Sequence, residues 1–290
     1  MFTNSNFTPA EQVSLSNEIA KVGVQSTPFT SMLMQKGNIE RANSTIYSFI
    51  EKVLDNTDDI TQEEGADATN FYSSNRKELN NIMEIFSKGV SISGSAQAMK
   101  QGQLSQEVND RLTELKIAME KKLITGKKQD GSTGKRKMSG LIEFADSSNA
   151  VSTTGNIKEQ TIKDAMQKLW NKDLMEGEYY ALVNADVKEN IDKIYENNYN
   201  YVHQTTNFGA LANSVNTNYG TVHFLLSKHV PANKAVFFNS AYTDLAYLRE
   251  PSFQPLAKNG DSNRALVVAE STLKVASPKA VSVVTTNTKA

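Results

Sequence analysis

The chain has 290 residues, of which 39% are hydrophobic, and its formal net charge is −1. This composition suffices for a sizeable core in one or two domains, and the balanced charge excludes an overall polyanion or polycation. The absence of cysteine excludes a disulfide framework and a thiolate metal site, and no apolar run approaches the roughly 20 residues that span a bilayer, so no membrane partner is expected.

The first predicted element is a helix at residues 8–23, TPAEQVSLSNEIAKVG. Thr8 can cap this helix, Pro9 fits its first position, and Glu11 completes a capping box. Its apolar face is loose, so we expect a short helix on a terminal arm. The first residues lack a basic region followed by an apolar run, so we expect no signal peptide.

Two segments rich in β-forming residues, 45–54 and 81–96, are predicted to be strands. The second alternates, with apolar residues at Ile82, Phe86, Val90 and Ile92. The stretch between the strands, 55–78, has little to bury, so we expect one long hairpin with an extended loop. Loops longer than about 12–15 residues are usually functional or disordered.

Negative charge is concentrated in this loop, which has no base before Arg76. Six carboxylates lie between Asp55 and Asp67: Asp55, Asp58, Asp59, Glu63, Glu64 and Asp67. Neither Asp55 nor Asp59 is followed by a glycine at the sixth position, so the loop is not an EF-hand calcium site. Weak, non-specific cation binding stays open as an alternative.

The clearest helix is predicted at residues 105–125, and Ser105 and Gly126 are its expected cap and stop. Spacings of three and four place these residues on one apolar stripe: Leu104, Val108, Leu112, Leu115, Met119 and Leu123. At ~1.5 Å per residue, such a helix is roughly 30 Å long.

The remainder alternates between helices and strands. Helices are predicted at 157–172, with Ile162, Ala165, Met166 and Leu169 inward, at 186–194, and briefly at 240–250 before Pro251. Strands are predicted at 179–185, 221–227 and 235–239, and in a β-rich tail at 264–288 that is interrupted at Pro278. The fold class is therefore α+β, with an arm, a long hairpin, a long helix, a mixed middle domain and closing strands.

No catalytic constellation is present. The three histidines, His203, His223 and His229, have no helical i, i+4 spacing, which argues for packing or surface roles over metal binding. Residues 126–133 resemble a phosphate loop in spacing but lack the lysine and follow a helix. We therefore expect no cofactor, no metal and no enzyme activity, and favour a structural subunit.

A basic run begins in the last turn of the long helix and continues to residue 137. It contains one acid, Asp130. Its seven bases are Lys121, Lys122, Lys127, Lys128, Lys135, Arg136 and Lys137. Bases at a helix C-terminus complement the helix dipole. This accounts for Lys121, Lys122 and Lys127 but not for residues 135–137. A solvated surface, contact with a protein and contact with nucleic acid all remain open for these, although no aromatic residues interleave them to stack bases.

Several segments resemble the major capsid proteins of tailed bacteriophages, in the subgroup typified by the phage SU-ten coat protein. They are NNIMEIFSKGVSISGSAQAMKQG, AMEKKLITG, GKRKMSGL, YGTVHFLLSKHVPANKAVFFN and LAYLREPSFQPLAKNGDSNRALVVAESTLKVASPKA. No single motif is decisive, but their shared order makes the resemblance specific from about residue 24 onward.

The resemblance implies the Hong Kong 97 (Johnson) capsid fold, with the parts in the order predicted above. Residues 1–42 would form the N-terminal arm and 43–98 the E-loop hairpin. Residues 99–149 would form the P-domain, with a spine helix at 103–126. Residues 150–263 would form the A-domain, and the strands of 264–290 would return to the P-domain.

The resemblance also implies a function. Copies of the chain would form hexamers and pentamers of an icosahedral shell around packaged double-stranded DNA, in the virion capsid after assembly in the host cytoplasm. A portal, a separate scaffolding protein and in some cases cement proteins are the expected partners, because the match begins too near Met1 to leave room for a cleaved scaffolding segment. The alternatives are the shell of an encapsulin-type nanocompartment and, from another class, a hydrolase or transferase.

Two contact surfaces between subunits are predicted. In the family the E-loop lies over the P-domain of a neighbour, so the acidic run is expected to dock on a neighbour's basic run. The competing hypothesis is that the bases face the packaged DNA. Apolar candidates for contacts between subunits are Phe71, Tyr72, Phe29, Met32, Leu33 and Met34.

Overall fold

A computed structural model describes most of the chain. The described residues are 25–54, 61, 63–65, 67, 74–99, 103–132, 134–175, 177–195, 203–206, 209–258 and 260–287. The helix predicted at 8–23 lies outside them, as do Asp55, Asp58, Asp59, Phe71 and Tyr72.

The first described element, helix α1 (Pro28–Lys36), is buried in the chain's own core. Pro28 occupies its first turn, and Gly37 ends it with a φ of 74°. Phe29, Met32 and Leu33 are at most 5% exposed, so the expectation that they contact other subunits is wrong. Met34 points outward and is 43% exposed.

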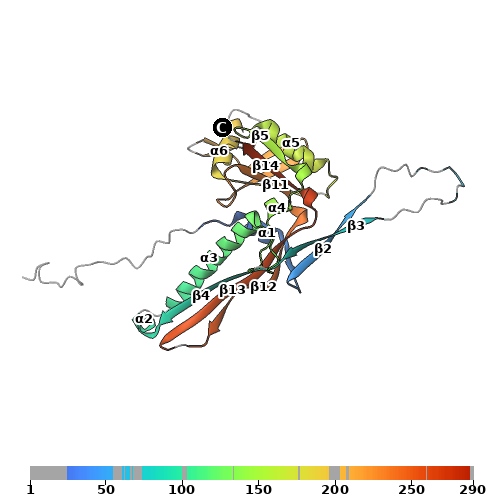
Figure 1. The fold of residues 1–290 in the computed structure, drawn as a ribbon. Helices are drawn as coiled ribbons and strands as arrows, with labels where there is room; N and C mark the ends of the chain where they lie inside the picture. The colour runs from blue at the N-terminus through green and yellow to red at the C-terminus, as the bar shows by residue number, and fades with distance from the viewer. Residues whose placement is uncertain are drawn as a thin grey trace, which may run out of the picture.

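A four-stranded sheet forms one half of the body, in the order β1-β12-β13-β4 (Figure 1). Its strands are β1 (Ile39–Arg41), β12 (Thr243–Leu256), β13 (Ser262–Val275) and β4 (Glu84–Ser93). The long helix α3 (Gln103–Thr125) lies along β4 and β13, and the apolar stripe predicted from its sequence faces them. The short helix α2 (Gly94–Met99) turns the chain from β4 toward α3.

The predicted hairpin has a different second strand. Strand β2 (Ile46–Val53) pairs antiparallel with β3 (Asn75–Ile82), whereas the predicted partner, β4, pairs with β13. The alternation of Phe86, Val90 and Ile92 identified β4 correctly, but these side chains face the helix α3 and the main core. The true partner of β2 is β3, NRKELNNI. It has no apolar alternation, so its sequence does not indicate a strand.

A six-stranded sheet forms the other half, in the order β5-β14-β11-β6-β10-β9. Its strands are β5 (Val151–Thr154), β14 (Val281–Asn287), β11 (Lys234–Asn239), β6 (Tyr179–Val183), β10 (Gly220–Leu226) and β9 (Ser214–Thr217). Helices α5 (Glu159–Trp170) and α6 (Ala185–Tyr195) pack on one face, and the inward residues predicted for α5 are fully buried. Strands β7 (His203–Thr206) and β8 (Gly209–Ala212) form a separate pair, and α4 (Leu141–Phe144) connects the halves.

Two predictions for the C-terminal third are wrong. Residues 240–250 do not form a helix: a 3-10 turn at Ser240–Tyr242 leads into β12. Pairing with β13 along the whole strand outweighs the local helical pattern, and Pro251 lies where the register shifts between Arg249 and Ser252.

The two strands of the predicted tail also belong to different sheets. β13 joins the four-stranded sheet as expected, but β14 lies between β5 and β11 in the six-stranded sheet, so residues 281–287 do not return to the domain of β13. A 3-10 turn at Pro278–Ala280 interrupts the pairing and carries the chain from one sheet to the other.

One hydrophobic core connects both halves. It includes Val267 of β13, Met119 of α3 and Phe238 of β11, each at most 1% exposed. The second face of the six-stranded sheet packs separately against α5 and α6. The two sheets are therefore joined by shared packing, not by a linker.

Candidate functional site

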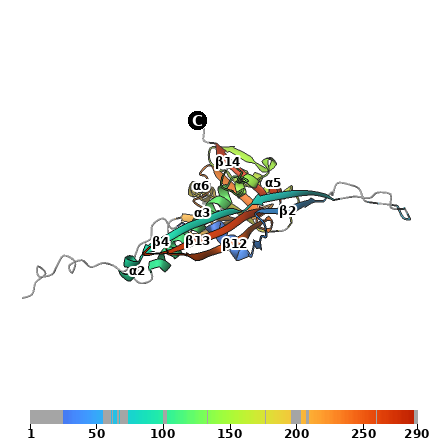
Figure 2. The same ribbon diagram turned by 60° about the horizontal axis from the view of Figure 1, so that its bottom comes forward.

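The β2–β3 hairpin stands out from the body on the side opposite to the β4–α2 end (Figure 1 and Figure 2). Its strands form a two-stranded sheet of their own. Strand β2 exposes apolar side chains along it, with Ile46 54% and Ile50 64% exposed. An isolated hairpin with an exposed apolar strand is marginal in water, so this element is built to be covered.

The acidic loop at the end of this hairpin is partly described. Glu63, Glu64 and Asp67 are exposed. Among the described residues, none of these three carboxylates forms an ion pair with the basic run of the same chain. The two runs are thus not joined within one subunit, as far as the structure describes them.

Polar contacts hold the base of the hairpin against the body. Tyr47 of β2 donates a hydrogen bond to Glu40, and Lys274 Nζ lies 2.6 Å from Glu40 Oε1 and 3.0 Å from Asp244 Oδ2. Burial and the Glu40 carboxylate raise the pKa of Tyr47 to about 12. Burial opposes the charge on Glu40, but hydrogen bonds from Lys274 and Tyr47 outweigh it and lower the pKa of Glu40.

Asn81, at the end of β3, is fully buried and anchors the second strand. Its Nδ2 donates to the carbonyls of Ser139 (3.0 Å) and Leu273 (2.7 Å), and its Oδ1 accepts from the N–H of Ser139 (2.8 Å). Farther along β2, Ser277 Oγ donates to Glu51 at 2.5 Å. The hairpin therefore leaves the body in a defined direction.

The basic run is divided by the structure. Arg136 Nη2 lies 2.7 Å from Glu270 Oε1, and Arg249 Nε lies 3.0 Å from Glu270 Oε2. Glu270 is 4% exposed, so the two guanidinium groups balance a buried carboxylate. Arg136 therefore stabilises the sheet and is not free to bind a partner as predicted.

Other bases of the run are also engaged within the chain. Lys122 Nζ lies 4.0 Å from Glu84 Oε1, and Lys128 Nζ donates to the carbonyl of Asn80 at 3.0 Å. Besides Lys122, Lys128 and Arg136, the run has four bases with neither an ion pair nor a side-chain hydrogen bond among the described residues: Lys121, Lys127, Lys135 and Lys137. Of these, Lys121, Lys127 and Lys135 are exposed, and they form the accessible part of the predicted basic surface.

The clearest polar site that the sequence did not indicate is Glu120 of α3, which is fully buried. Its carboxylate accepts hydrogen bonds from the N–H groups of Phe29 (2.9 Å) and Thr30 (2.8 Å) and from Thr30 Oγ1 (2.5 Å). Helix α1 is thus capped by a side chain 90 residues away. Burial raises the pKa of Glu120 against the lowering effect of these hydrogen bonds.

The described part of the chain offers neither a metal-binding cluster nor a membrane-spanning helix. No group of three or more histidine, aspartate or glutamate side chains there could hold a metal ion. No helix in that part is long and apolar enough to span a bilayer. His223 packs against Tyr180, with ring centroids 5.4 Å apart, and burial and Lys121 lower the pKa of His229.

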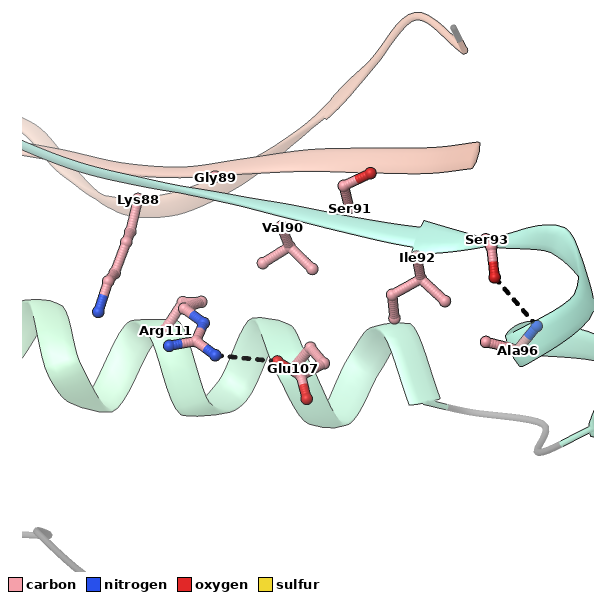
Figure 3. A pocket seen from close by; sticks show the side chains of 9 residues that line it. All are labelled: Lys88, Gly89, Val90, Ser91, Ile92, Ser93, Ala96, Glu107 and Arg111. Carbon is pink, nitrogen blue, oxygen red and sulfur yellow. Dashed lines mark hydrogen bonds and ion pairs between the residues drawn. The ribbon is translucent and has the colours of Figure 1, made fainter. Parts of the chain in front are cut away.

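A groove of about 500 Å³ runs between β4 and the start of α3 (Figure 3). Val90 and Ile92 point from β4 toward α3, from which Glu107 and Arg111 contribute. The remaining lining residues are Lys88, Gly89, Ser91, Ser93 and Ala96. Glu114 forms ion pairs with Lys88 and Arg111, and Arg111 also pairs with Glu107, so the charges along the groove are balanced.

Comparisons with known proteins agree with this arrangement. The family model described as SU10 major capsid protein matches residues 2–288. No curated protein matches the chain by sequence.

Among solved structures, a chain of Microbacterium phage Oxtober96 is similar with a TM-score of 0.69 and 10% identity, covering 98% of this chain and 99% of that one. The capsid structure of the cyanophage P-SCSP1u gives a TM-score of 0.68 and 12% identity, covering 99% and 97%. The SrpI encapsulin of Synechococcus elongatus gives a TM-score of 0.66 and 12% identity, covering 95% of this chain and 92% of that one. These likenesses show the fold alone, and it is the expected Hong Kong 97-like capsid fold.

Proposed function

Because the chain belongs to the SU10 major capsid protein family, we propose that its copies form the hexamers and pentamers of an icosahedral shell around the double-stranded DNA of a tailed bacteriophage. The chain is a major capsid protein with a structural and not a catalytic role, and it assembles with copies of itself in a virion capsid. The observation that carries this is the family match over nearly the whole chain, on a body whose hairpin exposes an apolar strand.

The domain assignment follows the family order. We propose that the arm, E-loop, P-domain and A-domain follow this order, with the E-loop formed by the β2–β3 hairpin, with β4, β12 and β13 in the P-domain beside α3, and with β14 in the A-domain. A portal, a separate scaffolding protein, cement proteins and the packaged DNA are proposed as partners, and assembly is proposed to take place in the host cytoplasm.

The second candidate is an encapsulin-type compartment, which is favoured by the fold shared with the SrpI encapsulin. The experiment that separates the two is to purify particles from cells that express the chain with its neighbouring genes, and to identify the enclosed material. The phage capsid predicts packaged DNA in shells seen by electron microscopy. Enzyme cargo without DNA would favour the compartment, and absence of shells under all conditions would contradict both.

We further propose that the acidic loop docks on the basic surface of a neighbouring subunit. Support comes from the exposure of Glu63 and Glu64 and of the accessible lysines, Lys121, Lys127 and Lys135, which have no partner acids among the described residues. Exposed pairs contribute only ~0.2–1 kcal/mol each, so their main effect is on steering and register.

This proposal predicts that the variant D58N/D59N/E63Q/E64Q folds normally but assembles several-fold more slowly, and that assembly of the wild type slows as salt rises. Light scattering measures the rate, and thermal unfolding of the unassembled chain measures folding. Two variants of the basic run serve as a matched pair, K135Q/R136Q and K127Q/K135Q. Only K135Q/R136Q should lower the stability of the unassembled chain, because of the replaced residues only Arg136 pairs with Glu270. Unchanged assembly and salt dependence in the acidic variant would contradict the proposal.

A further inference from the structure

The two edges of the four-stranded sheet differ in a way that bears on strand addition. β1 pairs with β12 only at residues 245–247, so the rest of β12 is an open edge. That edge contains Pro251 and Pro255, and its register shifts twice between Tyr247 and Ser252. Prolines and bulges are the devices that prevent an edge from pairing with another chain.

The opposite edge, β4, has none of these devices. It pairs with β13 in an unbroken register from Glu84 to Ser93 and contains no proline. Its one lysine, Lys88, forms an ion pair with Glu114 of α3 and is thereby held over the helix and away from the edge. As far as the structure describes the chain, one edge of this sheet is therefore blocked and the other is open.

The open edge also presents free backbone groups in a known pattern. The N–H of Gly94 donates to the carbonyl of Asp261 at 2.8 Å, in register with the β4–β13 ladder. Bonded and non-bonded pairs alternate in an antiparallel ladder, so the N–H groups of Ser87, Gly89 and Ser91 point to the open edge.

The groove between β4 and α3 lies along this edge. All six consecutive residues 88–93 line it, as do Glu107 and Arg111 of α3, whereas no residue of β13 does (Figure 3). An added strand would find backbone partners on β4, beside Val90 and Ile92, which stay packed in the core against α3. This is the geometry of strand addition to a sheet edge.

We propose that strand β2 of a second copy of this chain adds to the β4 edge. A chain cannot fill its own groove in this way, because its hairpin and its β4–α2 end point in opposite directions (Figure 1 and Figure 2). The inference rests on the proposed function, which brings copies of the chain together, and it names the surface that the hairpin covers.

The composition of the hairpin selects β2 over β3. β2 exposes the apolar side chains of Ile46 and Ile50 on one face, and strand addition at the β4 edge would cover them. The outer part of β3, residues 75–78, is polar and charged throughout. The hairpin is also only two strands wide, so β4 would supply the third strand that it lacks.

The first test compares Ser91→Pro with Ser91→Ala. Proline removes an N–H that points to the open edge and leaves the ladder to β13 intact, whereas alanine keeps the N–H. We expect S91A to assemble like the wild type, and S91P to lower the association constant between subunits roughly five- to tenfold per contact. Light scattering follows assembly of the full chain, and thermal unfolding of the unassembled chain checks that both variants fold.

The second test does not depend on folding of a proline variant. Since the chain has no cysteine, single cysteines can be placed at Ser91 on β4 and at Ser48 on β2, both exposed. A mixture of S91C and S48C chains should give crosslinked dimers with a short bifunctional maleimide during assembly. A mixture of S252C and S48C, with the cysteine on the blocked edge, should not.

The outcomes separate this inference from the proposed function. If shells form but S91P assembles like S91A, or if S252C crosslinks as well as S91C, the β4 edge is not the docking site and the inference is wrong. Crosslinking of S91C to a different protein of the particle would also overturn it. If the wild type forms no shells at all, the proposed function itself fails.

Discussion

A single buried carboxylate joins the first described helix to the longest one. Glu120 has no basic partner among the described residues and depends on three hydrogen bonds from the start of α1. Nothing in the sequence marks it, because it is one of several acids on α3 and its partners lie about 90 residues away.

The raised pKa of Glu120 has a defined effect on stability. In the folded chain this group binds a proton more tightly than in the unfolded chain, so its contribution to stability is largest below the ordinary glutamate pKa of about 4.5 and falls as pH rises through the folded value. We expect Glu120→Gln to lose this dependence, so its free energy of unfolding should improve relative to wild type between pH 5 and pH 8.

Denaturant unfolding at the two pH values measures this difference. Glu120→Ala, which leaves buried N–H groups without an acceptor, should cost roughly 2–4 kcal/mol. The control is Gln106→Ala at an exposed position of the same helix, which removes no titratable group and should change the free energy of unfolding equally at both pH values. A constant difference between E120Q and wild type at both pH values would contradict the assignment.

Charge along the sequence proved a poor guide to which bases are accessible. The run at 121–137 was grouped by spacing alone, yet Arg136 turns inward to Glu270 while its neighbour Lys135 is exposed. The deciding partner lies 134 residues away on β13, which no local pattern can indicate. The same holds for Asn81 and its contacts with Ser139 and Leu273.

At the scale of elements, strands and helices with a clear apolar period were predictable. The inward face of α5, the stripe of α3 and the alternation of β4 are present as predicted. Strands held by pairing and not by apolar alternation were missed: β3 is polar and sits in a hairpin, and β12 is stabilised by β13 over most of its length. Which strand pairs with β2, and therefore which residues form the hairpin, could be seen only in the three-dimensional structure.

The hairpin's direction should depend on Asn81. Asn81→Ala would remove the side-chain partner of two carbonyls and two N–H groups, so we expect a loss of roughly 2–4 kcal/mol in stability and faster amide exchange in β2 and β3. Chemical unfolding and hydrogen exchange measure the two effects. Glu78→Ala, on the exposed part of the same strand, should stay within about 0.5 kcal/mol of wild type. Equal effects of the two changes would argue against an anchoring role.

For the whole molecule, the shared core predicts cooperative unfolding. Phe238 of β11 lies 5.4 Å from the ring of Phe29 and 6.0 Å from that of Tyr180, and it is fully buried between the two sheets. Phe238→Ala should cost about 3–5 kcal/mol and destabilise both sheets together.

Two probes test this. The fluorescence of Trp170, the only tryptophan, reports on α5, and amide exchange of β13 reports on the other sheet. Both should shift equally in F238A, while Phe253→Ala, at a site 54% exposed, should shift neither by much. A shift of the fluorescence transition without a change in β13 would show that the halves unfold independently.

The position of β14 between β5 and β11 has a consequence for the order of events during synthesis. β14 is translated after every other strand of the six-stranded sheet, yet two of those strands pair with it. A nascent chain on the ribosome therefore exposes an incomplete sheet until β14 has emerged, although its earlier elements can already form. Chains that lack β14 cannot present a finished surface to one another, so subunit association is expected to wait until β14 of each copy has been made.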